Sequence, residues 1–202
     1  MRKEHETFYK SYGKTLIDFL LSLVGLIIIS PLLLIISLLI KIDSRGPIFF
    51  KQKRLGRNGE VFQIYKFRTM VVNAENIGDG LSIKNEKDNR ITKVGGFLRK
   101  TSLDELPQLI NVLRAEMALI GPRPPVTYHP YKGYYNYPEW AQKRFEVRPG
   151  ITGLAQVKVR NSATWDERIK YDNIYVDNLS IIYDTKIFFN TFRAVFNKDK
   201  IY

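Results

Sequence analysis

A long apolar segment with a proline near its centre constrains this chain more than any other feature of its sequence. Residues 19–40 include no charged side chain. At a rise of ~1.5 Å per residue, a straight helix of this length would reach ~33 Å, enough to cross the hydrocarbon core of a bilayer. Lys41 follows at once, without the small-residue cleavage site that ends a removable signal peptide. We therefore expect the segment to lie in a membrane.

The dipeptide Ser30-Pro31 lies near the midpoint of this segment. Proline removes a backbone donor and clashes with the preceding turn, so the helix should bend there. Both flanks of the segment are rich in Lys and Arg, and such flanks stay on the cytoplasmic side of a membrane. The helix could therefore bend and return to the face it entered. A single-pass anchor remains open, because spanning helices tolerate proline.

Composition restricts the available chemistry. The 202-residue chain has no Cys, which excludes a disulfide scaffold, a thiolate metal site and a cysteine nucleophile. Of its two His residues, His5 lies in a polar N-terminal tail, which leaves His129 as the candidate catalytic imidazole. The net charge of +12 indicates an anionic partner. Nucleic acid, acidic lipid headgroups and a phosphorylated substrate all satisfy that charge.

Two β-prone runs follow the apolar segment. Residues 48–53 and 61–67 flank Asn58-Gly59, a dipeptide that supplies the positive φ values of a tight turn. They predict a β-hairpin. Residues 73–89 are polar and contain two glycines, so they predict a surface loop or a lid.

Helical spacing appears twice in the second half of the chain. Apolar residues recur over 102–114 and predict an amphipathic helix, with Ser102 as its N-cap or Pro107 as its first residue. Residues 181–196 predict a helix that lies on a membrane surface or packs on the core. Together with the hairpin, these elements predict an α+β fold.

The adjacent acids Asp104 and Glu105 are the strongest candidates for chemistry. A carboxylate near cations and a helix N-terminus stays ionised, and an ionised aspartate can attack phosphorus or bind Mg²⁺. The alternative is a capping box between Ser102 and Glu105. The basic residues around the pair are Arg90, Lys93, Arg99, Lys100 and Arg114.

Further basic residues stand in stiff settings, several of them beside proline. Arginine pairs its donors with phosphate oxygens, so a group of such residues suits a diphosphate, although each alone could be a surface charge. No Walker-type loop and no GxGxxG motif is present. These residues are Lys66, Arg68, Arg123, Arg148 and Arg160.

Five motifs in a fixed order resemble those of the bacterial sugar transferases, the monotopic polyprenyl-phosphate phosphoglycosyl transferases. The resemblance extends from about Lys14 to Phe196 and covers nearly the whole chain. The motifs are GPIFFKQKRLGRNG at 46–59, KFRTM at 66–70, RKTSLDELPQLINVL at 99–113, GPRP at 121–124 and RPGITGLAQV at 148–157.

The resemblance implies an architecture. A polar tail, 1–13, precedes a re-entrant membrane helix, 14–41, that is broken at Ser30-Pro31. A cytosolic, membrane-associated catalytic domain, 42–202, then combines the hairpin with several amphipathic interfacial helices. The chain would lie on the cytoplasmic face of the bacterial inner membrane.

The resemblance also implies a reaction: transfer of a sugar-1-phosphate from a UDP-sugar to undecaprenyl phosphate, with release of UMP, to begin exopolysaccharide, capsule or glycoconjugate assembly. Asp104 would form a covalent phosphosugar, Glu105 would be the second acid of the pair, and both would hold Mg²⁺. Nucleic acid is not an expected partner, and a homo-oligomer remains open. The implied substrate-binding residues are Arg99, Lys66, Arg68, Arg123 and Arg148.

Three positions depart from the family pattern. Thr15 lies at the membrane boundary, where the change would weaken a headgroup contact. Ala115 and Val159 would reshape the sugar end of the pocket, so the sugar is not carried over. The rival interpretation is a non-catalytic basic protein that binds acidic lipid or nucleic acid at a membrane surface. A merely basic surface would not require an Asp-Glu pair flanked by Arg99 and Pro107.

Overall fold

A single long helix dominates the computed structural model, which describes residues 8–74, 88–159 and 163–196. A π-helical turn, η1 (Tyr9–Gly13), runs directly into α2 (Lys14–Asp43), so helix already begins inside the segment expected as a tail. The combined helix is long and apolar enough to cross a membrane, and only 11% of its most apolar stretch is buried inside the protein. Such an exposed apolar surface indicates association with a membrane.

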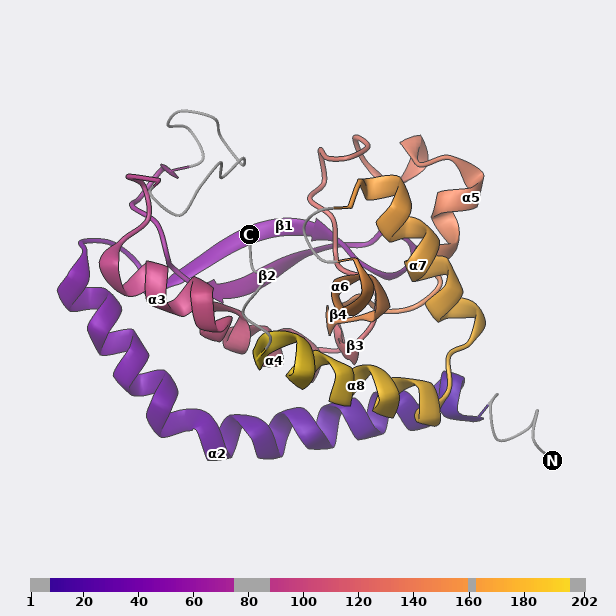
Figure 1. Ribbon diagram of the computed structural model, residues 1–202, viewed down its shortest axis with the longest axis horizontal. Coiled ribbons are helices and arrows are strands. Elements are labelled where there is room, and N and C mark those ends of the chain that lie inside the picture. Colours follow the sequence, from indigo (N-terminus) through magenta and orange to yellow (C-terminus); the bar gives the residue numbers. More distant parts are fainter. Residues whose placement is uncertain (1–7, 75–87, 160–162, 197–202) are drawn as a thin grey trace.

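The proline lies inside this helix. Helix α2 continues through Ser30-Pro31, and the Ser30 hydroxyl donates to the carbonyl of Ile27 at 2.9 Å. Figure 1 shows that α2 bends near its middle, with both halves facing the rest of the chain. The expected break is therefore a bend in a continuous helix. Its return to the same membrane face remains a prediction.

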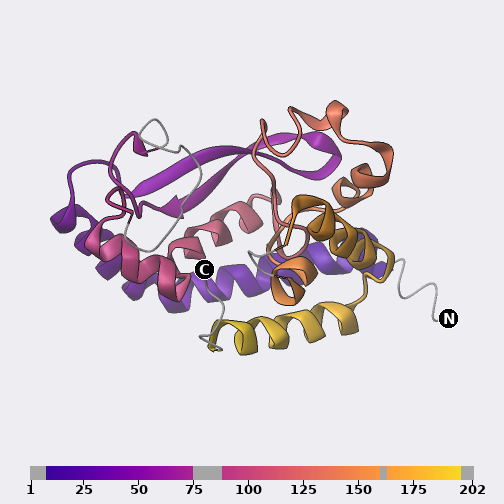
Figure 2. The same ribbon diagram turned by 45° about the horizontal axis from the view of Figure 1, so that its top comes forward.

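The expected β-hairpin is confirmed. Strands β1 (Phe49–Leu55) and β2 (Val61–Phe67) pair antiparallel, and the turn between them, η2 (Arg57–Gly59), has positive φ at Asn58 and Gly59. A side chain at Gly59 would also meet the ring of Tyr134. The hairpin lies on the opposite side of the domain from α8 (Figure 2).

The helix expected over 102–114 is wrong as a single α-helix. Helix α3 (Lys93–Thr101), which Thr92 caps, ends at Ser102 in a left-handed conformation with φ 57°. A 3₁₀ segment, η4 (Leu103–Gln108), and a short helix, α4 (Leu109–Leu113), follow. The left-handed residue turns the chain, and Pro107 removes a backbone donor, so a continuous α-helix cannot form. Asp104 and Glu105 therefore lie in the first turn of the 3₁₀ segment.

A second small sheet carries the loop that reaches the site. Strand β3 (Ala118–Ile120) pairs in parallel with β4 (Gly150–Thr152), so the fold mixes helix and sheet as expected. The short helical segments around it are η5 (Tyr134–Asn136), α5 (Glu139–Gln142), η6 (Lys143–Phe145) and α6 (Leu154–Lys158).

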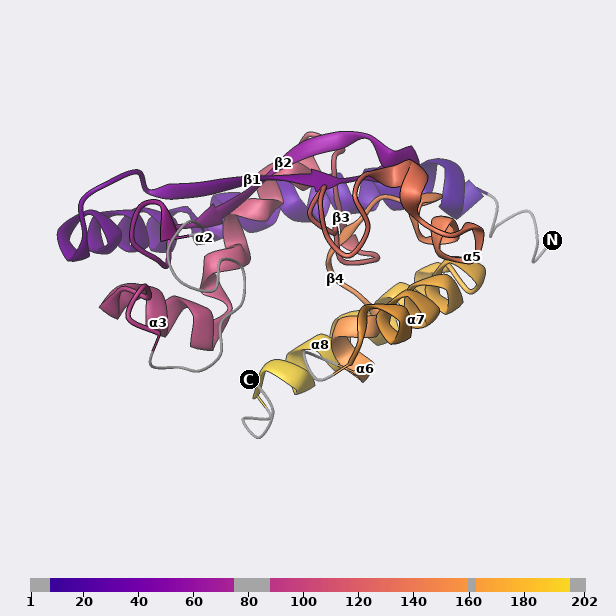
Figure 3. The ribbon, with the colours of Figure 1, turned by 90° about the horizontal axis from the view of Figure 1, so that it is seen from above.

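Two longer helices complete the described part of the chain. Helix α7 (Trp165–Asp177) begins with a capping box between Thr164 and Glu167, and α8 (Ile181–Phe196) follows. Helix α8 combines the two interpretations of its sequence: Ile187 is buried in the core, whereas aromatic side chains such as Phe189 are exposed. Seen from above, α2 runs along the length of the domain and α8 crosses away from it (Figure 3).

Apolar clusters hold the site-bearing elements in place. Phe67 of β2, Leu98 of α3 and Ile40 of α2 share one cluster, and Ile64 and Val112 share another that joins the hairpin to α4. Leu103 of η4 packs against the first cluster, so these contacts fix β2, α3, η4 and α4 relative to one another.

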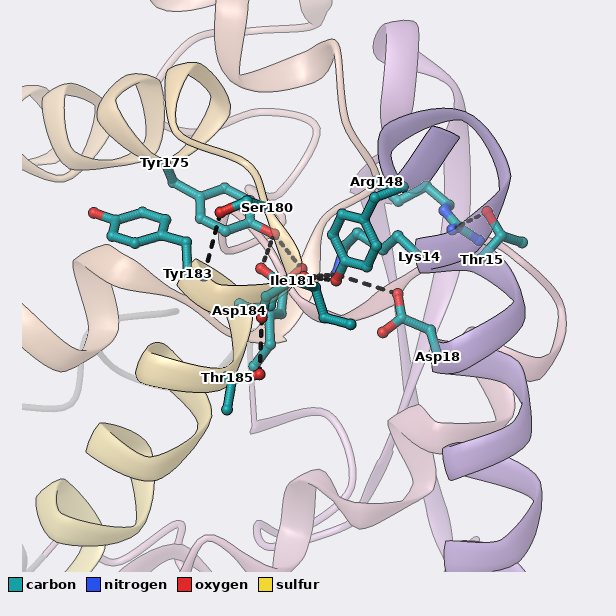
Figure 4. Close-up of polar contacts among 12 residues, drawn as sticks. Lys14, Thr15, Asp18, Arg148, Tyr175, Ser180, Ile181, Tyr183, Asp184 and Thr185 are labelled. Carbon is teal, nitrogen blue, oxygen red and sulfur yellow. Dashed lines mark hydrogen bonds and ion pairs between the residues drawn. The ribbon is translucent and has the colours of Figure 1, made fainter. Parts of the chain in front are cut away.

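A buried polar cluster ties the start of α2 to the domain (Figure 4). Lys14 donates to Asp184 of α8 at 2.7 Å and lies 3.3 Å from Asp18. The hydroxyls of Tyr9 and Tyr175 also contact Asp184, at 2.6 and 2.8 Å. A buried charge is costly unless it is paired, so this cluster fixes the beginning of α2 against α7 and α8.

We expect Lys14→Met to lower the free energy of unfolding by about 3 kcal/mol, because Asp184 would be left as a buried, unpaired charge. The thermal midpoint in nanodiscs measures this loss. Lys10→Met, one turn earlier at an exposed position, serves as the control and should melt like the wild type. Equal midpoints for the two variants would contradict the assignment.

Candidate active site

Glu105 is the centre of a charged cluster between the hairpin and η4. Lys66, near the end of β2, places its ammonium 2.5 Å from Glu105 Oε1. Both terminal nitrogens of Arg123, from the loop after β3, lie 3.5 Å from the same oxygen. This side chain does not form the alternative capping box, since Ser102 makes no side-chain cap bond and Glu105 turns to the cations.

The cations bind the two acids of the pair unequally. Burial alone would raise the pKa of Glu105, but Lys66 and Arg123 outweigh it and hold that pKa at about 2. For Asp104, burial raises the pKa above its usual value, the charge of Glu105 adds to the rise, and the cations offset it only in part. Neighbouring cations were expected to dominate at Asp104, so this direction differs from the sequence-based expectation.

No hydrogen bond or ion pair to the Asp104 carboxylate is found among the residues that the structure describes. Glu105 is therefore a stabilised anion. Asp104 is a partly desolvated carboxylate whose oxygens accept no hydrogen bond from the described residues. A carboxylate that is poorly stabilised as an anion is the better nucleophile of the two.

Arg99 joins this group from the last turn of α3. Its guanidinium donates to the Thr69 hydroxyl at 3.3 Å, and its charge lowers the pKa of Asp104. The structure thus brings Lys66, Arg99 and Arg123 together with the acid pair, and their binding of substrate remains a prediction. Three cations around two carboxylates leave positive charge for an anionic ligand such as a phosphate.

Arg68 and Arg148 are placed elsewhere, at opposite ends of α2. The buried Arg68 guanidinium donates to the carbonyl of Ser44 at 2.8 Å and also to that of Arg45, where it satisfies the chain leaving α2. Gly46 makes room for it, since a Cβ there would collide with Arg68. Arg148 donates to the Thr15 hydroxyl at 2.5 Å, close to the first turn of α2 (Figure 4).

The last sequence predictions concern Ser30-Pro31, Arg160 and the loop over 73–89. Ser30 and Pro31 lie in the middle of α2. Arg160 lies outside the described residues, and so does most of the loop expected over 73–89.

Sequence reasoning missed two residues behind Arg123. Arg144 of η6 donates to the carbonyl oxygen of Arg123 at 2.6 Å and pairs with Asp172 of α7 at 2.8 Å. A signal for Asp172 exists, because it falls at helical spacing with the buried Ile169 and Val176. An acid on the buried face of a helix needs a partner.

The chain belongs to the bacterial sugar transferase family, whose model matches residues 9–198. It is 43% identical over 191 residues to the UDP-glucose:undecaprenyl-phosphate glucose-1-phosphate transferase of Klebsiella pneumoniae, covering 92% of this chain and 40% of that protein. It is 38% identical over 202 residues to the undecaprenyl-phosphate galactose phosphotransferase of Salmonella typhimurium, covering 94% and 41%.

A shorter relative matches over most of its own length. The exopolysaccharide production protein ExoY of Sinorhizobium fredii is 38% identical over 196 residues, covering 91% of this chain and 85% of that protein. By contrast, the chain spans about two fifths of the length of the Klebsiella and Salmonella relatives.

We expect Arg68→Met to destabilise the fold by about 2 kcal/mol, because carbonyl groups at the end of α2 lose a charged donor. Donor-substrate affinity should stay near that of the wild type. Thermal unfolding and titration with UDP-glucose, which appears in the name of the Klebsiella relative, separate the two effects. An unchanged midpoint with a tenfold loss of affinity would instead make Arg68 a substrate-binding residue.

Proposed function

We propose that this chain transfers a sugar-1-phosphate from a UDP-sugar to undecaprenyl phosphate and releases UMP. The observation that carries the proposal is the unequal acid pair, in which Lys66 and Arg123 bind Glu105 and leave Asp104 uncommitted. The names of the Klebsiella and Salmonella relatives support the acceptor. Those names specify different sugars, glucose and galactose, so the sugar of this chain is not proposed.

The first step is attack by Asp104 on the β-phosphorus of the donor. A bond forms between a carboxylate oxygen and this phosphorus, the bond to the bridging oxygen breaks, and UMP leaves with the electron pair. The product is an aspartyl phosphosugar. Lys66, Arg99 and Arg123 carry the positive charge that stabilises the diphosphate and the departing phosphate.

The second step restores the enzyme. A phosphate oxygen of undecaprenyl phosphate attacks the phosphorus of the intermediate, the bond to Asp104 breaks, and the carboxylate leaves unchanged. The covalent intermediate lets one site serve a water-soluble donor and a lipid acceptor in turn.

The acid pair also suits Mg²⁺. No group of three or more His, Asp or Glu side chains that could hold a metal lies within the described parts of the chain. Mg²⁺, however, takes one or two carboxylates together with substrate phosphates. Asp104 and the second oxygen of Glu105 would hold it, since Oε1 is occupied by Lys66 and Arg123. When bound, the ion neutralises charge on the donor diphosphate.

The proposal also places the chain on the cytoplasmic face of the bacterial inner membrane, with α2 entering and leaving at that face. Both ends of α2 support this topology, because Lys14 is bound to Asp184 and the carbonyl of Ser44 is bound to Arg68. Contacts from both ends of the helix to one domain favour a path in which the two ends lie on the same side of a bilayer. The bend near the middle of α2, the helix that contains Pro31, gives it the shape that such a path needs (Figure 1).

We expect the wild type with Mg²⁺ and a matching UDP-sugar to release UMP, and Asp104→Asn to lower the rate by at least 10³-fold, since an amide is not a nucleophile toward phosphorus. A UMP-release assay across a panel of UDP-sugars measures both and identifies the sugar. Normal turnover by Asp104→Asn would contradict the assignment of Asp104 as the nucleophile. No release by the wild type with any donor would favour the non-catalytic alternative.

A second prediction concerns pH. Burial raises the pKa of Asp104 and the charge of Lys66 lowers it, so Lys66→Met should raise that pKa further. The ionised Asp104 carboxylate is the reactive form. The acid limb of the pH profile of kcat/KM for the donor should therefore move to higher pH. Lys53→Met, at an exposed position on the neighbouring strand, is the control and should leave the limb in place. A limb that stays fixed in Lys66→Met would contradict the electrostatic role of Lys66.

A further inference from the structure

Hydrogen bonds to backbone carbonyl groups hold the loop that carries Arg123 in place. Arg54 of β1 donates to the carbonyl of Pro124 at 2.9 Å, and the amide of Gly150 donates to that of Pro122 at 2.9 Å. The carbonyl of Arg123 itself accepts from Arg144 at 2.6 Å. A guanidinium therefore fixes the backbone of the residue whose own guanidinium contacts Glu105.

Arg144 is one of the most completely buried side chains of the described structure. Its side chain is 1% exposed and that of its partner Asp172 is 2% exposed. Two donors of Arg144, Nε and Nη1, have no hydrogen-bond partner among the described residues. A well-packed apolar pair is often as stable as a buried ion pair, so this pair is weak evidence for stability alone.

The ring of Trp165 and the charge of Arg168 restrict the orientation of the Arg144 side chain. Its guanidinium lies 5.7 Å from the ring centroid of Trp165, and that of Arg168 lies 5.5 Å from the same centroid. The charge of Arg123 lowers the pKa of Arg168, after the larger effect of burial, so these two cations are neighbours. Asp172 is the carboxylate that faces both Arg144 and Arg168.

We propose that Arg144, held by Asp172, is a positioning residue that sets where Arg123 meets Glu105. A continuous line of contacts runs from Asp172 of α7 through Arg144 and the Arg123 backbone to Glu105 of η4. The contact between Arg123 and Glu105 is long at 3.5 Å, so a small shift of the loop makes or breaks it. The proposal rests on the proposed function, because its consequence is the rate at which Asp104 attacks the donor.

The deciding variant removes the pair without leaving a buried charge. Arg144→Met combined with Asp172→Leu keeps apolar volume in place, so the protein should melt at or above the wild-type temperature. The single-turnover rate of UMP release should nevertheless fall at least tenfold, mainly in kcat rather than in KM for the donor. Arg144→Lys should show the same loss, because its shorter head cannot reach both the Asp172 carboxylate and the Arg123 carbonyl.

A surface ion pair between the same two elements is the matched control. Lys143 of η6 pairs with Asp177 of α7, and both side chains are well exposed. Lys143→Met should leave the rate of UMP release within twofold of the wild type.

A double-mutant cycle separates positioning from a merely structural role. If Arg144 acts through Arg123, the pair variant should cost little further rate in an Arg123→Met background. Independent, multiplying losses would overturn the proposal, and so would a folded pair variant that releases UMP within twofold of the wild type. A wild-type enzyme that releases no UMP would instead refute the proposed function.

Discussion

The contact between Lys66 and Glu105 is the interaction on which the rest of the site depends. It joins the end of β2 to η4 with an ammonium-to-carboxylate distance of 2.5 Å. With Arg123 it stabilises Glu105 as an anion, so the cations near the pair are largely committed to one of the two acids. Asp104, half-buried beside that anion, keeps a raised pKa, and its oxygens accept no hydrogen bond from the described residues. One carboxylate is thus held as an anion, and its neighbour has the free oxygens that the proposed nucleophile needs.

The apolar helix belongs to this arrangement because polar contacts tie both of its ends to the rest of the chain. The first turn is bound by Lys14 to Asp184, and the chain leaving the last turn is capped by Arg68. Between these ends the helix is apolar, bent and largely unburied, as a helix lying in lipid should be. The domain therefore stays close to the membrane surface, where the phosphate of a lipid acceptor would lie.

Local signals in the sequence predicted the elements that depend on interactions between residues near one another in the chain. The hairpin followed from two β-prone runs and from the turn at Asn58-Gly59. The route of the chain through Ser102 depends on a left-handed residue, which helical spacing does not reveal. Long-range contacts also could not be predicted from local signals. The sequence suggested Arg68 as a phosphate-binding residue, whereas in the fold its guanidinium donates to the carbonyl of Ser44. The role of Arg144 also could not be predicted, because it depends on the packing that buries this side chain against Asp172.

The central claim is that Asp104 itself carries the sugar-phosphate during the reaction. It is tested most directly by incubating the enzyme with donor and no acceptor, quenching it, digesting it, and locating the added mass by peptide sequencing in a mass spectrometer. The account predicts one sugar-phosphate per chain, attached to Asp104, which disappears when undecaprenyl phosphate is added. An adduct on another residue would contradict it. So would UMP release that begins only with acceptor present and leaves no adduct.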